Sequence, residues 1–381
     1  MVMESNQEQE QVMESKHGHT YCPERSAVAT VKVIGLGGGG CNAVARMYHE
    51  RVTGIEYLGV NTDTQHLVQV DIPQKIRIGD KLTRGLGVGG NPELGRESAE
   101  ENREDLYEAL RGADMVFIAS GMGGGTGTGA CPVVAEIAKE TGALTIAVVT
   151  KPFTFEGPRR AKQAEDGIQQ LRDKVDSLIV IPNQRLLSLC EADVTTEAAF
   201  KLADDVLRQG VQSIAELVTI SGEINLDFAD VKAIMSGAGQ AWMAIGTGQG
   251  ENRAIDAAKA AIASPILDVS IEGAKGILFN VTGGSDLTLH EVHAAAEIIE
   301  QMVDPNANII FGMVTDPKME DEVRITIIAT GFPAMDGLLP EQDLLYSQLD
   351  LESLNGDEDL DIPPFLRRHP ALRRRAASNG V

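Results

Sequence analysis

The chain has 381 residues and a formal net charge of −23. A length of this size predicts two domains, and so negative a charge argues against a general nucleic-acid binder, because most of the surface would repel the phosphate backbone. Cys22, Cys41, Cys131 and Cys190 show no metal-ligand spacing, so we expect reduced thiols and a cytoplasmic protein. The sequence contains no run of about 18 apolar residues and predicts no membrane span.

The first half alternates between strand and helix patterns after a polar segment, 1–29, that predicts a disordered arm. The apolar runs in it are continuous, as is typical of strands buried on both faces of a parallel sheet. We therefore expect a doubly wound α/β domain over 30–196, with its ligands at the carboxyl ends of the strands. Strands are predicted at 30–35, 54–60, 74–79, 113–119, 143–150 and 177–182, and helices at 42–50, 92–110, from Gly129 onward and at 158–175.

One long helical pattern over 197–219 separates this domain from the second half. Alternating strand and helix patterns beyond it predict a second, smaller α/β domain over 220–332, with a sheet of its own and joined through the long helix. The sequence then turns acidic and loses its periodicity, which predicts a linker over 333–358 and a separate tail over 359–381.

Two glycine-rich loops, VIGLGGGGCNAV (33–44) and SGMGGGTGTGA (120–130), each follow a predicted strand and open a helix. A helix start offers unpaired N–H groups and a positive dipole end to an anion, so two such loops can surround one polyphosphate. The chain has no Gly-Lys-Ser or Gly-Lys-Thr, so backbone amides, threonine hydroxyls and a metal ion would have to meet the phosphate charge. The first loop also matches the dinucleotide pattern G-x-G-x-x-G, so an oxidoreductase using NAD(P) remains an alternative, as do plain tight turns.

The second loop contains GGGTGTG (123–129), the tubulin signature, and its surroundings GADMVFIASGMGGGTGTGACPVVAEIAKE closely resemble the FtsZ family of cell-division GTPases. The likeness runs from about residue 30 to 332, and the tail peptide DIPPFLRR matches as well. It implies a tubulin/FtsZ-like fold, hydrolysis of GTP to GDP and phosphate, and head-to-tail assembly into the division (Z) ring at mid-cell beneath the membrane. It further implies Mg²⁺ held mainly by nucleotide phosphates and water, without protein metal ligands, and K⁺ as a further candidate ion.

The resemblance also places nucleotide contacts on this sequence. NTDTQ (61–65) and GVGGNPELGR (87–96) match loops near the metal and the γ-phosphate, and KPFTFEGPRR (151–160) supplies contacts to the ribose. Cys41 departs from the family, where glycine or another small residue is common; we interpret it as a tolerated small side chain, with a lowered thiol pKa at the helix N-terminus as the alternative. The expected nucleotide-binding residues of the two glycine-rich loops and of KPFTFEGPRR are Gly38, Gly39, Gly40, Cys41, Asn42, Gly125, Thr126, Gly127, Glu156 and Arg160.

Phe200 and Asp204 lie four residues apart in the long helical pattern and share one face of it. A ring that stacks on a purine, beside a carboxylate that accepts two N–H donors, would select guanine over adenine. The spacing alone fits a core phenylalanine and a solvated carboxylate equally well. The resemblance to FtsZ favours the guanine site.

The segment INLDFADVKAIM (224–235) gathers Asn225, Asp227 and Asp230 without a nearby base. One of these residues could simply cap the helix that follows. The resemblance instead implies a catalytic loop that reaches the γ-phosphate of the next subunit, where polar groups orient the attacking water. We therefore predict these three as catalytic residues; a member that binds nucleotide without hydrolysing it is the alternative.

The tail carries Ile362, Phe365 and Leu366 at i, i+3 and i+4, which suits a short amphipathic helix in a partner's groove. The resemblance implies that residues 359–368 bind a membrane tether such as FtsA or a functional equivalent, beside other division proteins. The arginine-rich end could touch anionic lipid weakly. A plain disordered end is the alternative.

Overall fold

The computed structural model describes residues 29–50, 54–187, 194–219, 227–264, 273–316, 319 and 321–332. The N-terminal arm up to residue 28, the linker, the tail peptide and Asn225 lie outside these residues. Within the described part, no helix is both long and apolar enough to cross a membrane.

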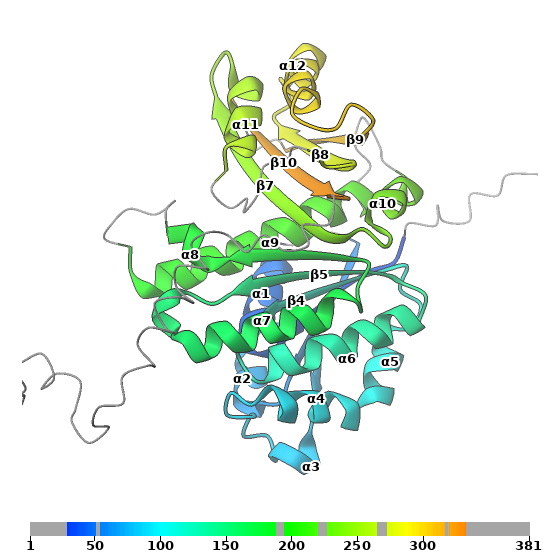
Figure 1. Cartoon of the computed structure of the whole chain (residues 1–381), viewed down its shortest axis with the longest axis vertical. Helices are drawn as coiled ribbons and strands as arrows, with labels where there is room; N and C mark the ends of the chain where they lie inside the picture. The colour runs from blue at the N-terminus through cyan, green and yellow to red at the C-terminus, as the bar shows by residue number, and fades with distance from the viewer. Residues whose placement is uncertain are drawn as a thin grey trace, which may run out of the picture. The chain divides into compact units, whose positions relative to one another are not determined.

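Parallel strands in the order β3-β2-β1-β4-β5-β6 form the first part of a ten-stranded sheet (Figure 1). β1, β4 and β5 are buried almost throughout because helices cover both faces, which explains their continuous apolar runs. The predicted doubly wound parallel sheet is confirmed. The strands are β1 (Val31–Leu36), β2 (Ile55–Asn61), β3 (Gln74–Arg77), β4 (Met115–Gly121), β5 (Leu144–Lys151) and β6 (Ser177–Pro182).

Two layers of helices enclose this parallel part. α1 (Gly37–His49) and α9 (Thr196–Thr219) share one hydrophobic cluster with one face of the sheet. The opposite face packs against α4 (Pro92–Glu101), α5 (Arg103–Leu110), α6 (Thr126–Glu140) and α7 (Pro158–Arg172). Shorter helices fill the connections: α2 (Thr64–Gln69), α3 (Asp80–Thr83), the 3₁₀ turn Thr154–Glu156 and α8 (Asn183–Leu186).

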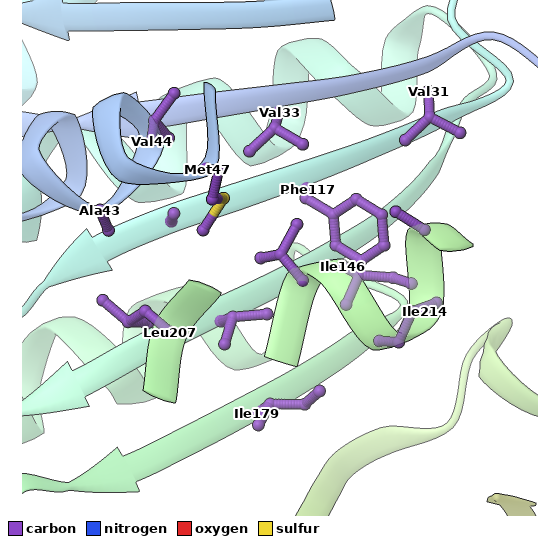
Figure 2. Close-up of a cluster of buried hydrophobic side chains, with 14 of the residues drawn as sticks. Val31, Val33, Ala43, Val44, Met47, Phe117, Ile146, Ile179, Leu207 and Ile214 are labelled. Carbon is purple, nitrogen blue, oxygen red and sulfur yellow. The ribbon is translucent and has the colours of Figure 1, made fainter. Parts of the chain in front are cut away.

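The long helix α9 is held along the sheet by a buried cluster shown in Figure 2. Leu207 and Ile214 of α9 belong to the same cluster as Met47 of α1 and Phe117 and Ile146 of the central strands. Full burial of one such side chain contributes about 1.5–3 kcal/mol. The packing therefore fixes α9 against the sheet. The first turns of α9 lie near the carboxyl ends of the parallel strands.

The second half continues the same sheet through β7 (Gly239–Gln249). Ser177–Ile179 of β6 pair in parallel with Gly239–Ala241, and the rest of β7 pairs with antiparallel β10. The expectation of a separate sheet is thus wrong, because β7 covers an edge of β6 that would otherwise leave its backbone groups unpaired. The other elements are β8 (Gly276–Gly283), β9 (Asn308–Thr315), β10 (Glu322–Thr330), α10 (Phe228–Met235), α11 (Arg253–Ile262) and α12 (Leu289–Glu300).

The helix predicted over 92–110 is divided at Asn102, where α4 ends and α5 begins. Oδ1 of Asn102 accepts a hydrogen bond from the Gly79 amide at 2.9 Å, and Nδ2 donates to Asp105 at 2.8 Å. The break therefore depends on a contact with a segment 23 residues earlier. A local periodicity does not contain that information.

Candidate functional site

A cavity of about 650 Å³ opens at the carboxyl edge of the parallel strands. Its walls include Leu36, Asn61, Gly121, Thr150 and Asn183, each within one residue of the end of β1, β2, β4, β5 or β6. This is the edge at which open α/β sheets bind ligands, and the volume suits a small molecule.

Both glycine-rich loops form the cavity wall with the first turns of their helices. α1 begins at Gly37 and α6 at Thr126, earlier than the predicted Asn42 and Gly129. Gly37 makes the turn from strand into helix with φ +69°, a conformation that favours glycine. The unpaired N–H groups of two helix N-termini therefore line one cavity, which is an arrangement suited to an anion.

The glycines of these loops serve two different purposes. A Cβ on Gly40 would clash with the carbonyl oxygen of Ala119, and a Cβ on Gly129 with that of Pro92, so these two allow close packing of backbones. Gly124, by contrast, faces open space on the cavity. Some glycines of these loops therefore allow helices and strands to pack closely, and others leave space in the cavity for a ligand.

A third loop joins the two glycine loops at the cavity. Thr62, which follows β2, is buried, and its hydroxyl lies 2.7 Å from that of Thr126 at the start of α6. The bond brings the NTDTQ segment against the tubulin signature. Hydroxyls and backbone amides thus lie together at the loops for which the sequence predicts phosphate contacts.

Most of the predicted nucleotide-binding residues meet around this cavity, but Gly40 and Cys41 do not line it. The Cys41 thiol is buried and lies 3.4 Å from the carbonyl oxygen of Gly35 and 3.5 Å from that of Val60. Burial raises the pKa of Cys41 to about 12, so the alternative of a lowered thiol pKa is wrong. The predicted residues that line the cavity are Gly38, Gly39, Asn42, Gly125, Thr126, Gly127, Glu156, Arg160, Phe200 and Asp204.

The start of α9 provides an aromatic and acidic end to the cavity. The ring of Phe200 is 40% exposed, which excludes the core alternative, and meets Phe153 edge-on at a centroid distance of 5.4 Å. Asp204 is half-buried and forms an ion pair of 3.4 Å with Arg46 of α1. Burial raises the pKa of Asp204 to about 6, against the opposing effect of Arg46. A planar base would find a ring and an acceptor side by side here.

Glu156 and Arg160 form an ion pair at the cavity wall. The Glu156 carboxylate also accepts a hydrogen bond of 2.9 Å from the Phe153 amide, and this bond ties the pair to the aromatic end. Arg160 itself is exposed. Its guanidinium is therefore available to an anionic or hydroxylated group in the cavity.

Three residues of this site were not predicted from the sequence. Arg46 reaches Asp204 from α1, and His66 of α2 lines the cavity. Asn183 is 5% exposed, and its Oδ1 has no hydrogen-bond partner among the described residues. Asn183 could have been found, because it directly follows a predicted strand at the edge where ligands bind. Arg46 and His66 carry no such signal.

The helix α10, which carries Asp230 and has Asp227 at its N-cap, lies at the opposite end of the parallel strands. Phe200, near the start of α9, lines the cavity, whereas a Cβ on Gly54, just before β2, would lie 3.1 Å from Thr219 at the end of α9. Their separation of 19 positions corresponds to about 28 Å of helix. At this end of the strands, the carbonyl of Met235, at the end of α10, accepts a hydrogen bond from Ser177, the first residue of β6.

Asp227 and Asp230 are exposed at the start of α10 and do not line the cavity. Asp227 occupies the N-cap position, yet within the described residues its side chain accepts no capping hydrogen bond. The helix-capping alternative therefore has little support. A single copy of the chain does not bring these carboxylates to the cavity.

Two family models match the chain in order. The GTPase domain of the Tubulin/FtsZ family matches residues 30–191, and the C-terminal domain of the FtsZ family matches residues 239–333. The match to a GTPase domain includes the first glycine-rich loop, and it argues against both the NAD(P) oxidoreductase and the non-hydrolysing alternative.

Solved structures give the same result. An empty FtsZ dimer from M. jannaschii is 46% identical, and the match covers 80% of this chain and 88% of that one with a TM-score of 0.77. A tryptophan-to-tyrosine mutant of FtsZ from M. jannaschii is also 46% identical over 80% and 91%, with a TM-score of 0.78. CetZ1 from Haloferax volcanii, as a GDP-bound monomer, is 23% identical over 86% and 100% with a TM-score of 0.71, which is a likeness of fold. By identity, coverage and both domain models, the chain belongs to the FtsZ family of self-assembling cell-division GTPases.

Proposed function

We propose that GTP binds in the cavity and is hydrolysed only where a second copy of the chain closes it. Guanine lies against Phe200 and Asp204, and the phosphates lie between the N-termini of α1 and α6. The observation that carries the proposal is that the cavity and α10, the helix that carries Asp230 and starts after Asp227, lie at opposite ends of the parallel strands. Head-to-tail stacking brings Asp227 and Asp230 of one copy to the cavity of the next, and the same contact builds the filament of the Z ring.

The proposed catalytic residues Asn225, Asp227 and Asp230 act on the neighbour's γ-phosphate by holding and polarising the attacking water. Asp227 and Asp230 fit this role because they are exposed and have no ion-pair partner among the described residues. On the cavity side, Gly38, Gly39, Gly125 and Gly127 present backbone amides to the phosphates.

Mg²⁺ is proposed to enter with the nucleotide rather than to occupy a protein site of its own. In the described part of the chain, no group of three or more His, Cys, Asp or Glu residues could hold a metal. The Thr62 and Thr126 hydroxyls and the Asp63 carboxylate at the cavity are oxygen donors of the kind that Mg²⁺ accepts beside phosphates and water. The bound ion would neutralise phosphate charge, and K⁺ is a further candidate there.

We also propose the domain division, the location and the partners of the chain. Residues 30–196 form the GTP-binding domain, 197–219 form the connecting helix whose Phe200 and Asp204 complete the guanine site, and 220–332 form the second domain with the catalytic segment. The tail over 359–381 follows the linker 333–358 and binds a tether such as FtsA, so that filaments assemble at mid-cell beneath the membrane. The amphipathic spacing of Ile362, Phe365 and Leu366 supports the tether site.

The test of the proposed function is sedimentation with GTP, GDP or ATP while phosphate release is followed. We expect polymer and phosphate with GTP, and neither with ATP at the same concentration. Phosphate release from unpolymerised protein would contradict the requirement for a second copy.

Replacing Asp204 by alanine is expected to weaken GTP binding by about 1–3 kcal/mol, because two donors of guanine lose their acceptor in an enclosed site. The matched control is Asp205→Ala, which removes the same charge one residue further on and outside the cavity lining. Binding is measured by titration with a fluorescent GTP analogue. Equal affinities of the two variants would contradict the guanine assignment.

A pH series gives the same prediction a second readout. The ionised carboxylate accepts both guanine donors, and the pKa of Asp204 is raised to about 6 by burial. GTP affinity should therefore fall as the pH is lowered through about 6, because protonation then competes with guanine. Asp204→Asn should lose this component, while titration of the nucleotide phosphates remains common to both proteins. An identical pH dependence in both would contradict the assignment.

Removing residues 359–381 is expected to leave polymerisation and GTP hydrolysis unchanged and to abolish recruitment to a membrane coated with tether protein. The proposed tether peptide lies wholly within the deleted segment. Vesicle co-sedimentation with and without the tether measures recruitment. Loss of GTPase activity in the truncated chain, above its assembly threshold, would show that the tail belongs to the catalytic body.

A further inference from the structure

Three polar side chains at the cavity form a chain of hydrogen bonds between β2, α2 and α1. Asn61 Nδ2 lies 3.4 Å from His66 Nδ1, and His66 Nε2 lies 3.1 Å from Asn42 Oδ1. All three residues line the cavity. The phosphate and guanine contacts proposed above give His66 no role, so the purpose of its ring is open.

The direction of these hydrogen bonds follows from the backbone around Asn61. Its Oδ1 accepts from the amides of Thr62 at 2.9 Å and Asp63 at 3.3 Å, so Nδ2 is the group left to donate to His66 Nδ1. A ring nitrogen that accepts carries no proton, which places the proton of the neutral imidazole on Nε2. Nε2–H then donates to Asn42 Oδ1. The orientation of one buried asparagine thus sets the tautomer of His66 and the orientation of Asn42.

His66 is held in place independently of any ligand. Asp63 caps α2 and accepts hydrogen bonds from the amides of Gln65 and His66, and Leu67 is buried in the core. A Cβ on Gly38 would lie 3.7 Å from His66 Nε2, so the ring stands beside the first glycine loop. The backbone of α2 is thus anchored, and the two hydrogen bonds of the ring orient the imidazole on it.

This arrangement leaves the Nδ2 group of Asn42 as a hydrogen-bond donor of fixed orientation. Its Oδ1 is taken by His66, and its Nδ2 has no partner among the described residues although Asn42 lines the cavity and is exposed. Without His66, the amide of Asn42 could rotate and present either oxygen or nitrogen, and an oxygen would repel an acceptor on the nucleotide.

We propose that His66 is a positioning residue that fixes the Asn42 amide so that its NH₂ group faces a hydrogen-bond acceptor of the bound guanine nucleotide. The inference rests on the proposed binding of GTP in this cavity. The ring itself does not touch the reacting atoms. It acts through Asn42, so its effect is on nucleotide affinity more than on the hydrolytic step.

The first test measures affinity for GDP and GTP in four proteins. His66→Leu removes the donor and is expected to weaken binding about five- to tenfold, which lies within the range of one hydrogen bond. His66→Gln keeps an N–H donor near the position of Nε2 and should restore affinity to within about twofold. His49→Ala, which removes an exposed histidine at the end of α1 outside the cavity lining, is the matched control and should bind as wild type.

A double-mutant cycle separates positioning from structural support. If His66 acts through Asn42, His66→Leu should have no further effect on affinity in the Asn42→Ala background. Additive losses would overturn the proposal, and so would a lowered unfolding midpoint of His66→Leu with unchanged nucleotide affinity.

The tautomer is tested without any nucleotide. The ¹⁵N resonances of the His66 ring in the free protein should show the proton on Nε2, and a proton on Nδ1 would overturn the proposal. This measurement keeps the two hypotheses distinguishable. Wild-type protein that binds neither GTP nor GDP would contradict the proposed function, while the ring spectrum would still report the hydrogen-bond chain.

Discussion

Replacing Gly129 by alanine is expected to destabilise the folded chain by about 3 kcal/mol or more, the upper range for overpacking. Helix propensity alone predicts the opposite, because Gly129 lies within α6 and alanine is favoured over glycine in a helix by about 1 kcal/mol. The new Cβ would clash with the carbonyl oxygen of Pro92 and lie 2.6 Å from the amide nitrogen of Arg96. Both are backbone atoms of α4, so relief requires that α4 moves away from α6.

The matched control for this prediction is Gly124→Ala in the same loop. A Cβ there meets nothing within 4 Å, so stability should change by no more than about 0.5 kcal/mol. Urea unfolding without nucleotide measures both, because Gly124 lines the cavity and its variant would otherwise differ in ligand binding. If Gly129→Ala were as stable as Gly124→Ala, the close packing of α4 on α6 would be refuted.

This contrast also shows what the sequence could not predict about the site. A run of glycines indicates that backbones come close to something, but Gly40 and Gly129 meet other backbones, whereas Gly124 faces the cavity. Only the register of neighbouring elements separates these cases. Cys41 is similar: its thiol is buried between β1 and β2, and no local pattern states which side of the helix start it takes.

The fold itself was more accessible from the sequence. Strands buried on both faces leave continuous apolar runs, so β4 and β5 were expected within two residues of their observed ends. What failed depends on contacts far apart in the chain. The break at Asn102 is set by Gly79, and the joining of both halves into one sheet is set by three residue pairs between β6 and β7.

The positions of the two halves of the proposed active site lead to the prediction with the largest effect on activity. The cavity lies at the carboxyl ends of the parallel strands. Asp227 and Asp230 belong to α10, which contacts the first residue of β6 at the opposite end of these strands. Because one copy does not bring them together, GTP hydrolysis per molecule should rise from near zero above a critical protein concentration. Phosphate release measured against concentration tests this. Constant specific activity down to dilutions without polymer would contradict a shared site.

Asp230→Ala should bind GTP as tightly as wild type but hydrolyse it about 100-fold more slowly, the lower range for removing a group that moves or orients a proton. Asp256→Ala is the matched control, because Asp256 is also an exposed acid in the first turn of a helix in the second half. Both variants lose a similar interaction with the helix dipole, so a difference between them reports the active site alone. Mixed with Asp204→Ala, at a GTP concentration that leaves the Asp204→Ala cavity largely empty, Asp230→Ala should regain activity, because its intact cavity meets the intact Asp230 of its neighbour. No gain of activity in copolymers of the two variants would place the complete site within one subunit.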